Sequence, residues 1–141
     1  MLKDRDPDQP VLYFAYGANM DIDAMAWRCP NARPRGVFLL RDWELQFYCH
    51  ATIEPRPGSA VAGVLWALTP DCERSLDRFE GYPDYYTKRT WCQDGQWIMF
   101  YEMTDPKSGR PSPGYVGNIA ESYQHWQLPQ HRLQEALDDF A

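Results

Sequence analysis

Residues 11–20 read VLYFAYGANM, an apolar run of strand-forming residues that ends in a glycine and a short polar turn. The run from Val11 to Tyr16 predicts a short buried strand. Gly17 frees the backbone to turn sharply, so that consecutive N–H groups can point into one concavity that suits a carboxylate or an oxyanion. On spacing alone, an ordinary strand-to-helix turn is the simpler interpretation of the same residues.

Six short strands are expected along the chain, at residues 11–16, 36–40, 43–49, 60–68, 86–92 and 96–103. Arg41 and Asp42 predict a tight hairpin turn between the second and third strands, and the proline-containing stretch 50–59 predicts a loop. Asp94-Gly95 predicts a two-residue hairpin between the last two strands. Helices are expected at residues 22–28, 70–80, 115–126 and 130–139, the last with three apolar residues on one face: Leu133, Leu137 and Phe140.

This pattern of many short strands with few long connections predicts an α+β fold. We expect a small mixed, mostly antiparallel β-barrel with peripheral short helices. Residues 1–10 are polar and are expected to form a flexible N-terminus. Residues 11–141 are enough for a single domain with its own core.

The composition excludes several classes of function. The 141 residues carry a formal net charge of −6, which disfavours nucleic acid and anionic membranes as partners. No apolar run approaches the ~18 residues of a membrane helix, and the chain has no apolar segment of a secretory signal near its start. The four cysteines form no C-x-x-C pair, so we expect reduced thiols and a cytoplasmic location. The three histidines have no ligand spacing and the phosphate-binding glycine motifs are absent, so we expect neither a metal nor a cofactor.

Residues 79–86 read FEGYPDYY and follow a well-marked helix. Thr69 predicts its N-cap, Pro70 its first turn and Gly81 its end, with three apolar residues on one face: Cys72, Leu76 and Phe79. Glu80 therefore falls on the last turn, where the helix dipole disfavours a carboxylate. If the surrounding rings also desolvate Glu80, its pKa rises toward the range that is useful for proton transfer. A solvated glutamate at a helix end is the alternative interpretation.

At these two motifs the chain resembles the gamma-glutamylcyclotransferase family. The family signature Y-G-S-N-[LM] is matched by residues 16–20, and its G-V-x-[WY]-x-[LM]-T segment by residues 63–69. The family's L-D-x-x-E-G helix is matched by residues 76–81, with Tyr86 six residues after the glutamate. Its P-S-x-x-Y segment is matched by residues 111–115, and a later L-P by residues 128–129. The motifs occur in family order and together cover residues 11 to 140.

The resemblance implies an amide-cleaving, cyclising enzyme of the acyltransferase or lyase class. Such an enzyme releases 5-oxoproline when the substrate's own alpha-amine attacks its gamma-carbonyl. The resemblance assigns Glu80 as the general acid and base. It places backbone groups against the glutamyl part of a small-molecule substrate, with side chains around them: Tyr16, Gly17, Ala18, Asn19, Met20, Tyr86 and Tyr115. The last two tyrosines are expected to act as hydroxyl donors and aromatic walls.

Ala18 departs from the family pattern, which has a serine at this position. Two other functions on the same scaffold stay open at this point. One is a binding protein that recognises a gamma-glutamyl compound or small acid without turning it over, and the other is hydrolysis through an activated water, which yields free glutamate. The sequence names neither the particular gamma-glutamyl substrate nor the oligomeric state.

Overall fold

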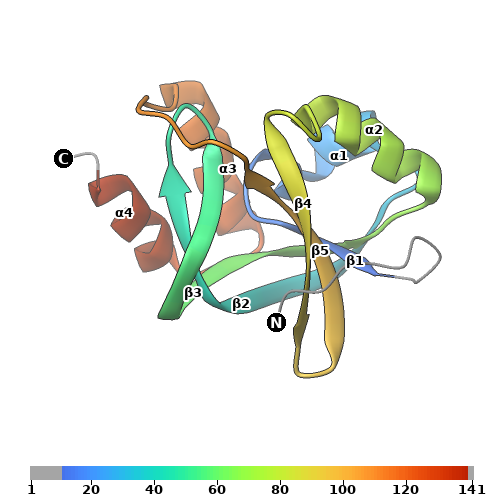
Figure 1. Ribbon diagram of the computed structural model, residues 1–141, viewed down its shortest axis with the longest axis horizontal. Helices are drawn as coiled ribbons and strands as arrows, with labels where there is room; N and C mark the ends of the chain where they lie inside the picture. Colours follow the sequence, from blue (N-terminus) through green and yellow to red (C-terminus); the bar gives the residue numbers. More distant parts are fainter. Residues whose placement is uncertain (1–10, 140–141) are drawn as a thin grey trace.

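The structure is a computed structural model that describes residues 11–139. The expected flexible segment 1–10 and the expected position of Phe140 lie outside the described residues. Within them the fold is α+β, with one mixed sheet and helices around it (Figure 1). The elements run in the order β1 (Leu12–Ala15), η1 (Ala18–Met20), α1 (Ile22–Arg28), β2 (Arg33–Phe47), β3 (Ala51–Ala67), α2 (Pro70–Glu80), β4 (Tyr86–Gln93), β5 (Gln96–Met103), α3 (Pro113–His125) and α4 (Gln130–Asp138).

The short strand β1 lies at the centre of the sheet, whose order among the described residues is β2-β3-β1-β5-β4. It pairs antiparallel with the end of β3 and parallel with β5. Residues 13–16 are all buried, as expected of a central strand covered on both faces. The chain leaves β1 at Tyr16 and turns into the single 3-10 turn η1.

The strands β2 and β3 form one long hairpin, so two local expectations are wrong. Asp42 makes no hairpin turn, and residues 51–59 of the expected loop 50–59 belong to β3. Asp42 and Gly58 both have positive φ, and the Gly58 N–H donates to Oδ1 of Asp42 at 3.1 Å. These residues build an irregularity where the register shifts between Arg41 and Trp43. A bulge uses the same turn-forming residues as a hairpin and also tolerates prolines inside a strand.

The real reversal of this hairpin is a tight turn at residues 48–50, where the N–H of Tyr48 donates to the carbonyl of His50 at 3.0 Å. The expected six strands therefore become five in the described chain. The other hairpin, between β4 and β5, has its turn at Asp94-Gly95 as predicted.

The barrel is not closed, because the edge strands β2 and β4 share no backbone ladder. Side chains bridge this seam. The amide of Gln93 accepts from the N–H of Arg41 at 2.8 Å and donates to the carbonyl of Leu39 at 2.9 Å. The indole rings of Trp43 and Trp91 meet edge to face beside it, with centroids 5.5 Å apart. The mixed, mostly antiparallel sheet and its peripheral helices are thus confirmed, but the barrel is open and its edges meet through side chains.

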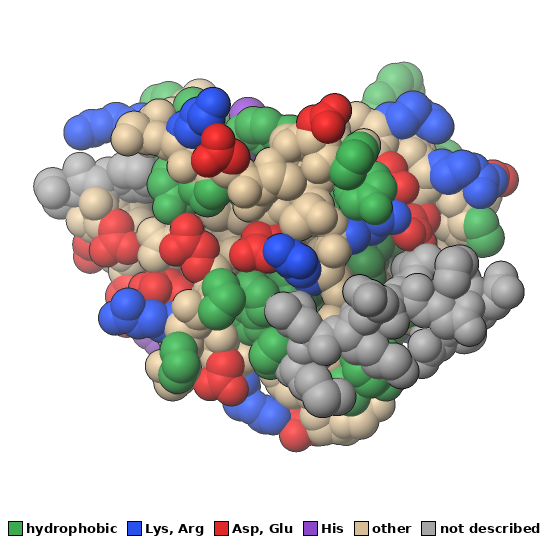
Figure 2. All heavy atoms as spheres, in the orientation of Figure 1, with side chains coloured by type: hydrophobic (Ala, Val, Ile, Leu, Met, Phe, Trp, Pro, Cys, Tyr) green, Lys and Arg blue, Asp and Glu red, His purple; other side chains and the backbone are tan. Residues whose placement is uncertain are grey.

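The helices lie at the ends and on one side of the sheet (Figure 1). The helices α1 and α2 lie together at one end, and α4 packs on β2 at the other. None of the helices between residues 11 and 139 is long and apolar enough to cross a membrane. On the face drawn in Figure 2, acidic and basic side chains are interspersed and the basic ones do not gather in one stripe.

Gly63 marks the closest approach between the central strands. A Cβ atom at this position would lie 2.4 Å from the carbonyl oxygen of Ala15 and 2.7 Å from the ring of Phe14. Backbone atoms cannot move aside as the end of a flexible side chain can. Glycine is therefore required here for β3 to lie against β1.

We predict that Gly63→Ala lowers the free energy of unfolding by about 2 kcal/mol or more, as overpacking of a rigid core does. Denaturant unfolding followed by circular dichroism measures the effect. Gly117→Ala in α3 is the matched control, because a Cβ there would meet no atom within 4 Å apart from the neighbouring residues and the backbone of its own helix. Since alanine favours a helix over glycine by roughly 0.5–1 kcal/mol, the control is expected to stabilise the protein. Equal unfolding free energies for wild type and Gly63→Ala would contradict the close approach.

Candidate active site

One cavity of about 300 Å³ opens where β1, α2 and the tip of the long hairpin meet. Its wall includes every site residue expected from the sequence except Met20. The lining residues are Tyr13, Tyr16, Gly17, Ala18, Asn19, His50, Ala51, Arg78, Phe79, Glu80, Gly81, Tyr85, Tyr86, Tyr101 and Tyr115. Met20 is fully buried behind the turn, and its carbonyl accepts from the indole N–H of Trp126 at 2.9 Å.

The turn after β1 forms one side of the cavity. The carbonyl of Gly17 accepts from the N–H of Met20 at 3.1 Å, and that of Ala18 accepts from Asp21 at 3.3 Å. The first N–H groups of such a turn have no partner inside it. A Cβ at Gly17 would lie 3.4 Å from the hydroxyl of Tyr115, so glycine keeps this side of the cavity open.

The helix α2 contributes Glu80 to the cavity wall. It begins and ends as predicted: the Thr69 hydroxyl accepts from the N–H of Cys72 at 3.2 Å, and Gly81 adopts a left-handed conformation with φ 67°. Cys72 and Leu76 are buried on the expected face. Phe79 is 49% exposed, however, and not packed in the core. The Phe79 ring lies under the guanidinium of Arg28 instead.

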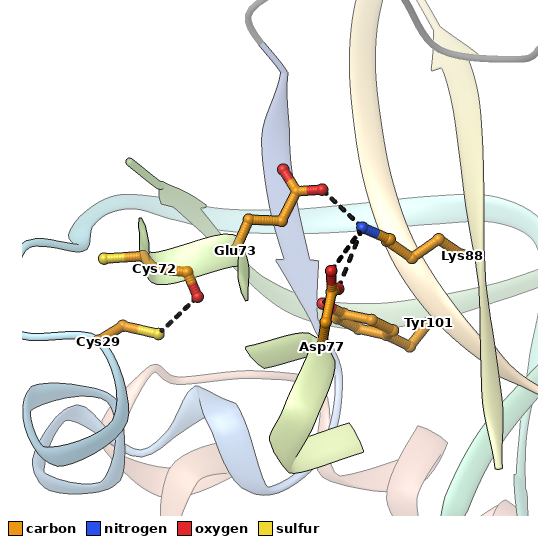
Figure 3. Close-up of polar contacts among 6 residues, drawn as sticks. All are labelled: Cys29, Cys72, Glu73, Asp77, Lys88 and Tyr101. Atoms are coloured by element: carbon orange, nitrogen blue, oxygen red, sulfur yellow. Dashed lines mark hydrogen bonds and ion pairs between the residues drawn. The ribbon is translucent and has the colours of Figure 1, made fainter. Parts of the chain in front are cut away.

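A polar cluster holds α2 against the sheet (Figure 3). Nζ of Lys88 on β4 donates to Glu73 at 2.7 Å and to Asp77 at 3.0 Å. The hydroxyl of Tyr101 on β5 donates to Asp77 at 2.7 Å. These side chains are only about one-fifth exposed, so solvent screens the ion pairs less than it screens pairs on the open surface. The cluster fixes the helix that carries Glu80.

Glu80 is partly buried, and its carboxyl group lies at the cavity wall. Burial raises its pKa to about 7, while the positive charge of Arg28 opposes that rise. Oε1 of Glu80 accepts a hydrogen bond from Nδ2 of Asn19 at 3.2 Å. Near neutral pH this group is therefore present in both protonation states, which is what a group that takes and returns a proton requires.

Three tyrosines of the cavity have their hydroxyl protons engaged by the protein. Tyr16 donates to the backbone carbonyl of Tyr101 at 2.6 Å, and Tyr101 donates to Asp77. Tyr86 donates to the carbonyl of Ala51 at 2.6 Å. Tyr86 therefore presents a ring and an oxygen lone pair to the cavity, and its expected role as a hydroxyl donor is not supported by this geometry.

Two other tyrosines accept hydrogen bonds from the protein. Tyr13 accepts from Nδ2 of Asn19 at 3.0 Å, and Tyr115 accepts from the N–H of Ala51 at 3.0 Å. Their hydroxyl protons are thus not used in these contacts. Burial raises the pKa of Tyr115 to about 12 and that of Tyr13 well above its ordinary value, so both stay protonated at neutral pH. These two are the hydroxyls best placed to donate to a ligand.

The sequence does not single out several residues of this region. It indicates Tyr13 only as part of the buried strand, and Tyr85 only as part of the aromatic surroundings of Glu80. It predicts a loop at His50, yet this residue lies at the hairpin tip, where Nδ1 is 2.8 Å from the hydroxyl of Tyr85. Arg28 is the last residue of α1, and its guanidinium donates a hydrogen bond to the side chain of Asn19. No local signal distinguishes Tyr13, His50 and Arg28, since only the folded chain brings them close to Glu80. No group of three or more metal-ligating side chains is found in residues 11–139.

The raised pKa of Glu80 predicts a pH-dependent stability. The folded state binds the carboxyl proton more tightly than the unfolded chain does, so this contribution is complete below about pH 4.5 and is lost as pH rises through about 7. The free energy of unfolding of wild type should therefore fall relative to Glu80→Gln across this window, by about 3 kcal/mol at most. Parallel denaturant titrations of both proteins between pH 4 and about pH 8.5 measure it. A difference that stays constant with pH would show that Glu80 ionises normally.

Comparisons with known proteins show which family the chain belongs to. The sequence model of the family described as Gamma-glutamyl cyclotransferase, AIG2-like matches residues 13–127. A gamma-glutamylcyclotransferase of Bos taurus is 36% identical, over 86% of this chain and 74% of that protein. The gamma-glutamylcyclotransferase of Homo sapiens is 32% identical, with the same coverage of each chain. A solved structure of a gamma-glutamyl cyclotransferase matches with a TM-score of 0.78 and 29% identity, over 91% of this chain and 86% of the other. The chain is an enzyme that belongs to the gamma-glutamyl cyclotransferase, AIG2-like family.

Proposed function

We propose that this enzyme releases 5-oxoproline from a gamma-glutamyl amide by attack of the substrate's own alpha-amine on its gamma-carbonyl carbon. One observation carries the proposal: Glu80 is the single carboxyl group lining the cavity described here, and its pKa is raised to about 7. The lining contains no serine, threonine, cysteine or lysine side chain that would act as a nucleophile. A reaction whose nucleophile belongs to the substrate fits such a wall.

The proposed reaction needs one proton acceptor that later becomes a donor. The alpha-ammonium group loses a proton to Glu80, and its nitrogen then bonds to the gamma-carbonyl carbon to close a five-membered ring. Glu80 returns this proton to the leaving nitrogen as the bond from that carbon to it breaks. Glu80 then carries the second proton of the ring nitrogen to the departing amine, which leaves as an ammonium ion. The products are 5-oxoproline and a free amine in its ammonium form, no water is consumed, and Glu80 ends in its starting state.

The pKa of Glu80 suits this exchange. An alpha-ammonium group has a pKa of about 8 at a chain terminus and a higher one beside a free alpha-carboxylate, so an ordinary carboxylate with a pKa near 4 is a poor base for it. A carboxyl with a pKa of about 7 comes closer to the pKa of the group that it deprotonates. Most of the remaining barrier is one of orientation, because the chain must fold so that amine and carbonyl meet, and holding it in that shape is worth several kcal/mol.

The other residues expected from the sequence bind and shape the substrate in this proposal. Backbone groups of Gly17, Ala18 and Asn19 face the glutamyl part, and Tyr115 donates its free hydroxyl proton. Tyr16 and Tyr86 supply ring walls, and Met20 supports the turn from behind. Ala18 stands where the family has a serine, so the serine hydroxyl is lost but the backbone N–H donors stay in place. Loss of that hydroxyl costs about 0.5–1.5 kcal/mol if it makes one ordinary hydrogen bond.

The expected cytoplasmic location is part of the same proposal. All four cysteines of the chain are free thiols, and burial raises the pKa of Cys29 to about 12, so this thiol stays protonated. Free thiols are usual in a reducing compartment.

We predict that Glu80→Gln lowers kcat by about 10²–10⁴-fold, because it removes the only proposed proton carrier and keeps the shape of the side chain. The assay incubates the pure protein with a panel of gamma-glutamyl dipeptides, gamma-glutamyl amines and glutathione, and separates 5-oxoproline from glutamate by chromatography. Glu135→Gln on the exposed side of α4 is the matched control and should turn over at the wild-type rate.

Three outcomes would overturn the proposal. Free glutamate as the product would show hydrolysis by an activated water. Thermal stabilisation by a gamma-glutamyl compound without any product, across the whole panel, would show a binding protein. Wild-type turnover by Glu80→Gln would remove Glu80 from the proton transfer.

A further inference from the structure

Arg28, the last residue of α1, lies outside the cavity lining but is held tightly against it. Its Nη1 donates to Oδ1 of Asn19 at 2.6 Å, and its guanidinium lies 3.7 Å from the centre of the Phe79 ring. Its backbone carbonyl accepts from the hydroxyl of Ser75 on α2 at 2.8 Å. The next residue, Cys29, donates through Sγ to the carbonyl of Cys72 at 3.5 Å (Figure 3). Both the main chain and the side chain of Arg28 are thus fixed by α2, the helix that carries Glu80.

The chemistry of these groups decides which way the Asn19 amide faces. A guanidinium has donors only, so the amide must turn its oxygen toward Arg28. Its NH₂ group is then directed the other way, where it donates to Tyr13 and to Oε1 of Glu80. With the opposite orientation, two donors would face each other at the Arg28 end, and the amide oxygen would face the Glu80 carboxyl group.

We propose that Arg28 is a positioning residue that acts through Asn19: it fixes the amide so that its NH₂ group donates to Glu80 and holds that carboxyl group at the cavity wall as a hydrogen-bond acceptor. This inference rests on the proposed function of Glu80. It adds a residue that contacts neither the cavity nor, by its own hydrogen bonds, the proton carrier.

The other titratable groups around Glu80 do not replace the positive charge of Arg28. Six tyrosines interact with it, from β1 and the residue after it, from β4 and the residue before it, from β5 and from α3: Tyr13, Tyr16, Tyr85, Tyr86, Tyr101 and Tyr115. Burial raises the pKa of each, so all are neutral where Glu80 titrates. On α2 itself, Asp77 is paired with Lys88. Arg78 and His50 also line the cavity, but Arg28 is the group whose charge lowers the pKa of Glu80.

Loss of Arg28 should therefore raise the pKa of Glu80 in two ways. The carboxylate loses a nearby positive charge, and the amide is free to turn its oxygen toward Glu80, where only the protonated carboxyl group can donate to it. Both favour the protonated form. In Arg28→Met the titration of Glu80 should move to higher pH by about one unit, and kcat/KM should fall about tenfold near pH 6 and recover above about pH 9.

The experiment follows Glu80 directly, by the ¹³C shift of its side-chain carboxyl carbon as a function of pH, alongside kcat/KM over the same range. Arg28→Lys keeps a positive donor and should titrate close to wild type, which a merely structural loss would not restore. Arg74→Met is the matched control, because Arg74 pairs with Asp71 on the exposed side of α2. Asn19→Leu serves as the background for a double-mutant cycle, in which Arg28→Met should shift the titration by less than half as much.

The outcomes separate this inference from the proposed function. Coincident titrations of wild type and Arg28→Met overturn the role of Arg28, whatever the activity. The same shift in the wild-type and Asn19→Leu backgrounds shows an action by charge alone and also overturns it. If the carboxyl titrations behave as expected while wild type forms no 5-oxoproline, the positioning by Arg28 stands and the proposed reaction fails.

Discussion

The hydrogen bond between Asn19 and Glu80 joins residues that are 61 positions apart, and the arrangement of the site depends on this contact. One partner lies in the turn after the central strand, and the other on the last turn of α2. The contact forms only if β1 is seated against β3 and α2 is seated against β4 and β5. Gly63 meets the first condition, because any side chain there would push β3 away from β1. The cluster around Lys88 meets the second.

Sequence reasoning succeeds where one short segment contains all the determining atoms. Thr69, Pro70 and Gly81 are enough to place both ends of α2, because capping is a local property of the chain. Asp94-Gly95 likewise places the β4–β5 hairpin. Asp42 and Gly58 lead to wrong predictions of a turn and a loop, because their determinants do not lie in one segment. Each has the positive φ that its residue type favours, but the two combine across strands into one irregularity, and no single segment contains that information.

The candidate site divides in a similar way. An acid at a helix end among aromatic residues is visible in the sequence, and desolvation then gives the direction of its pKa. Arg28 and His50 are not visible, since an arginine at the end of a helix or a histidine near a turn has the same local pattern when it is solvated. The tyrosines are visible as a group, but their individual roles depend on whether each hydroxyl donates to the protein or accepts from it. That distinction separates Tyr86 from Tyr115 only in the folded structure.

Arg28 acts on Glu80 without a direct ion pair, and this affects the pKa of Glu80. Within residues 11–139 these two side chains form no ion pair, and the Asn19 amide stands between them. A direct arginine–carboxylate pair would lower the pKa of the carboxyl group by about 1–3 units and leave a weak base. The guanidinium orients the neutral Asn19 amide, which in turn positions Glu80. Because the amide separates the two charges, the guanidinium lowers the pKa of Glu80 less than a direct ion pair would. Glu80 can therefore be held in a fixed position while burial still keeps its pKa near that of the amine from which it is proposed to take a proton.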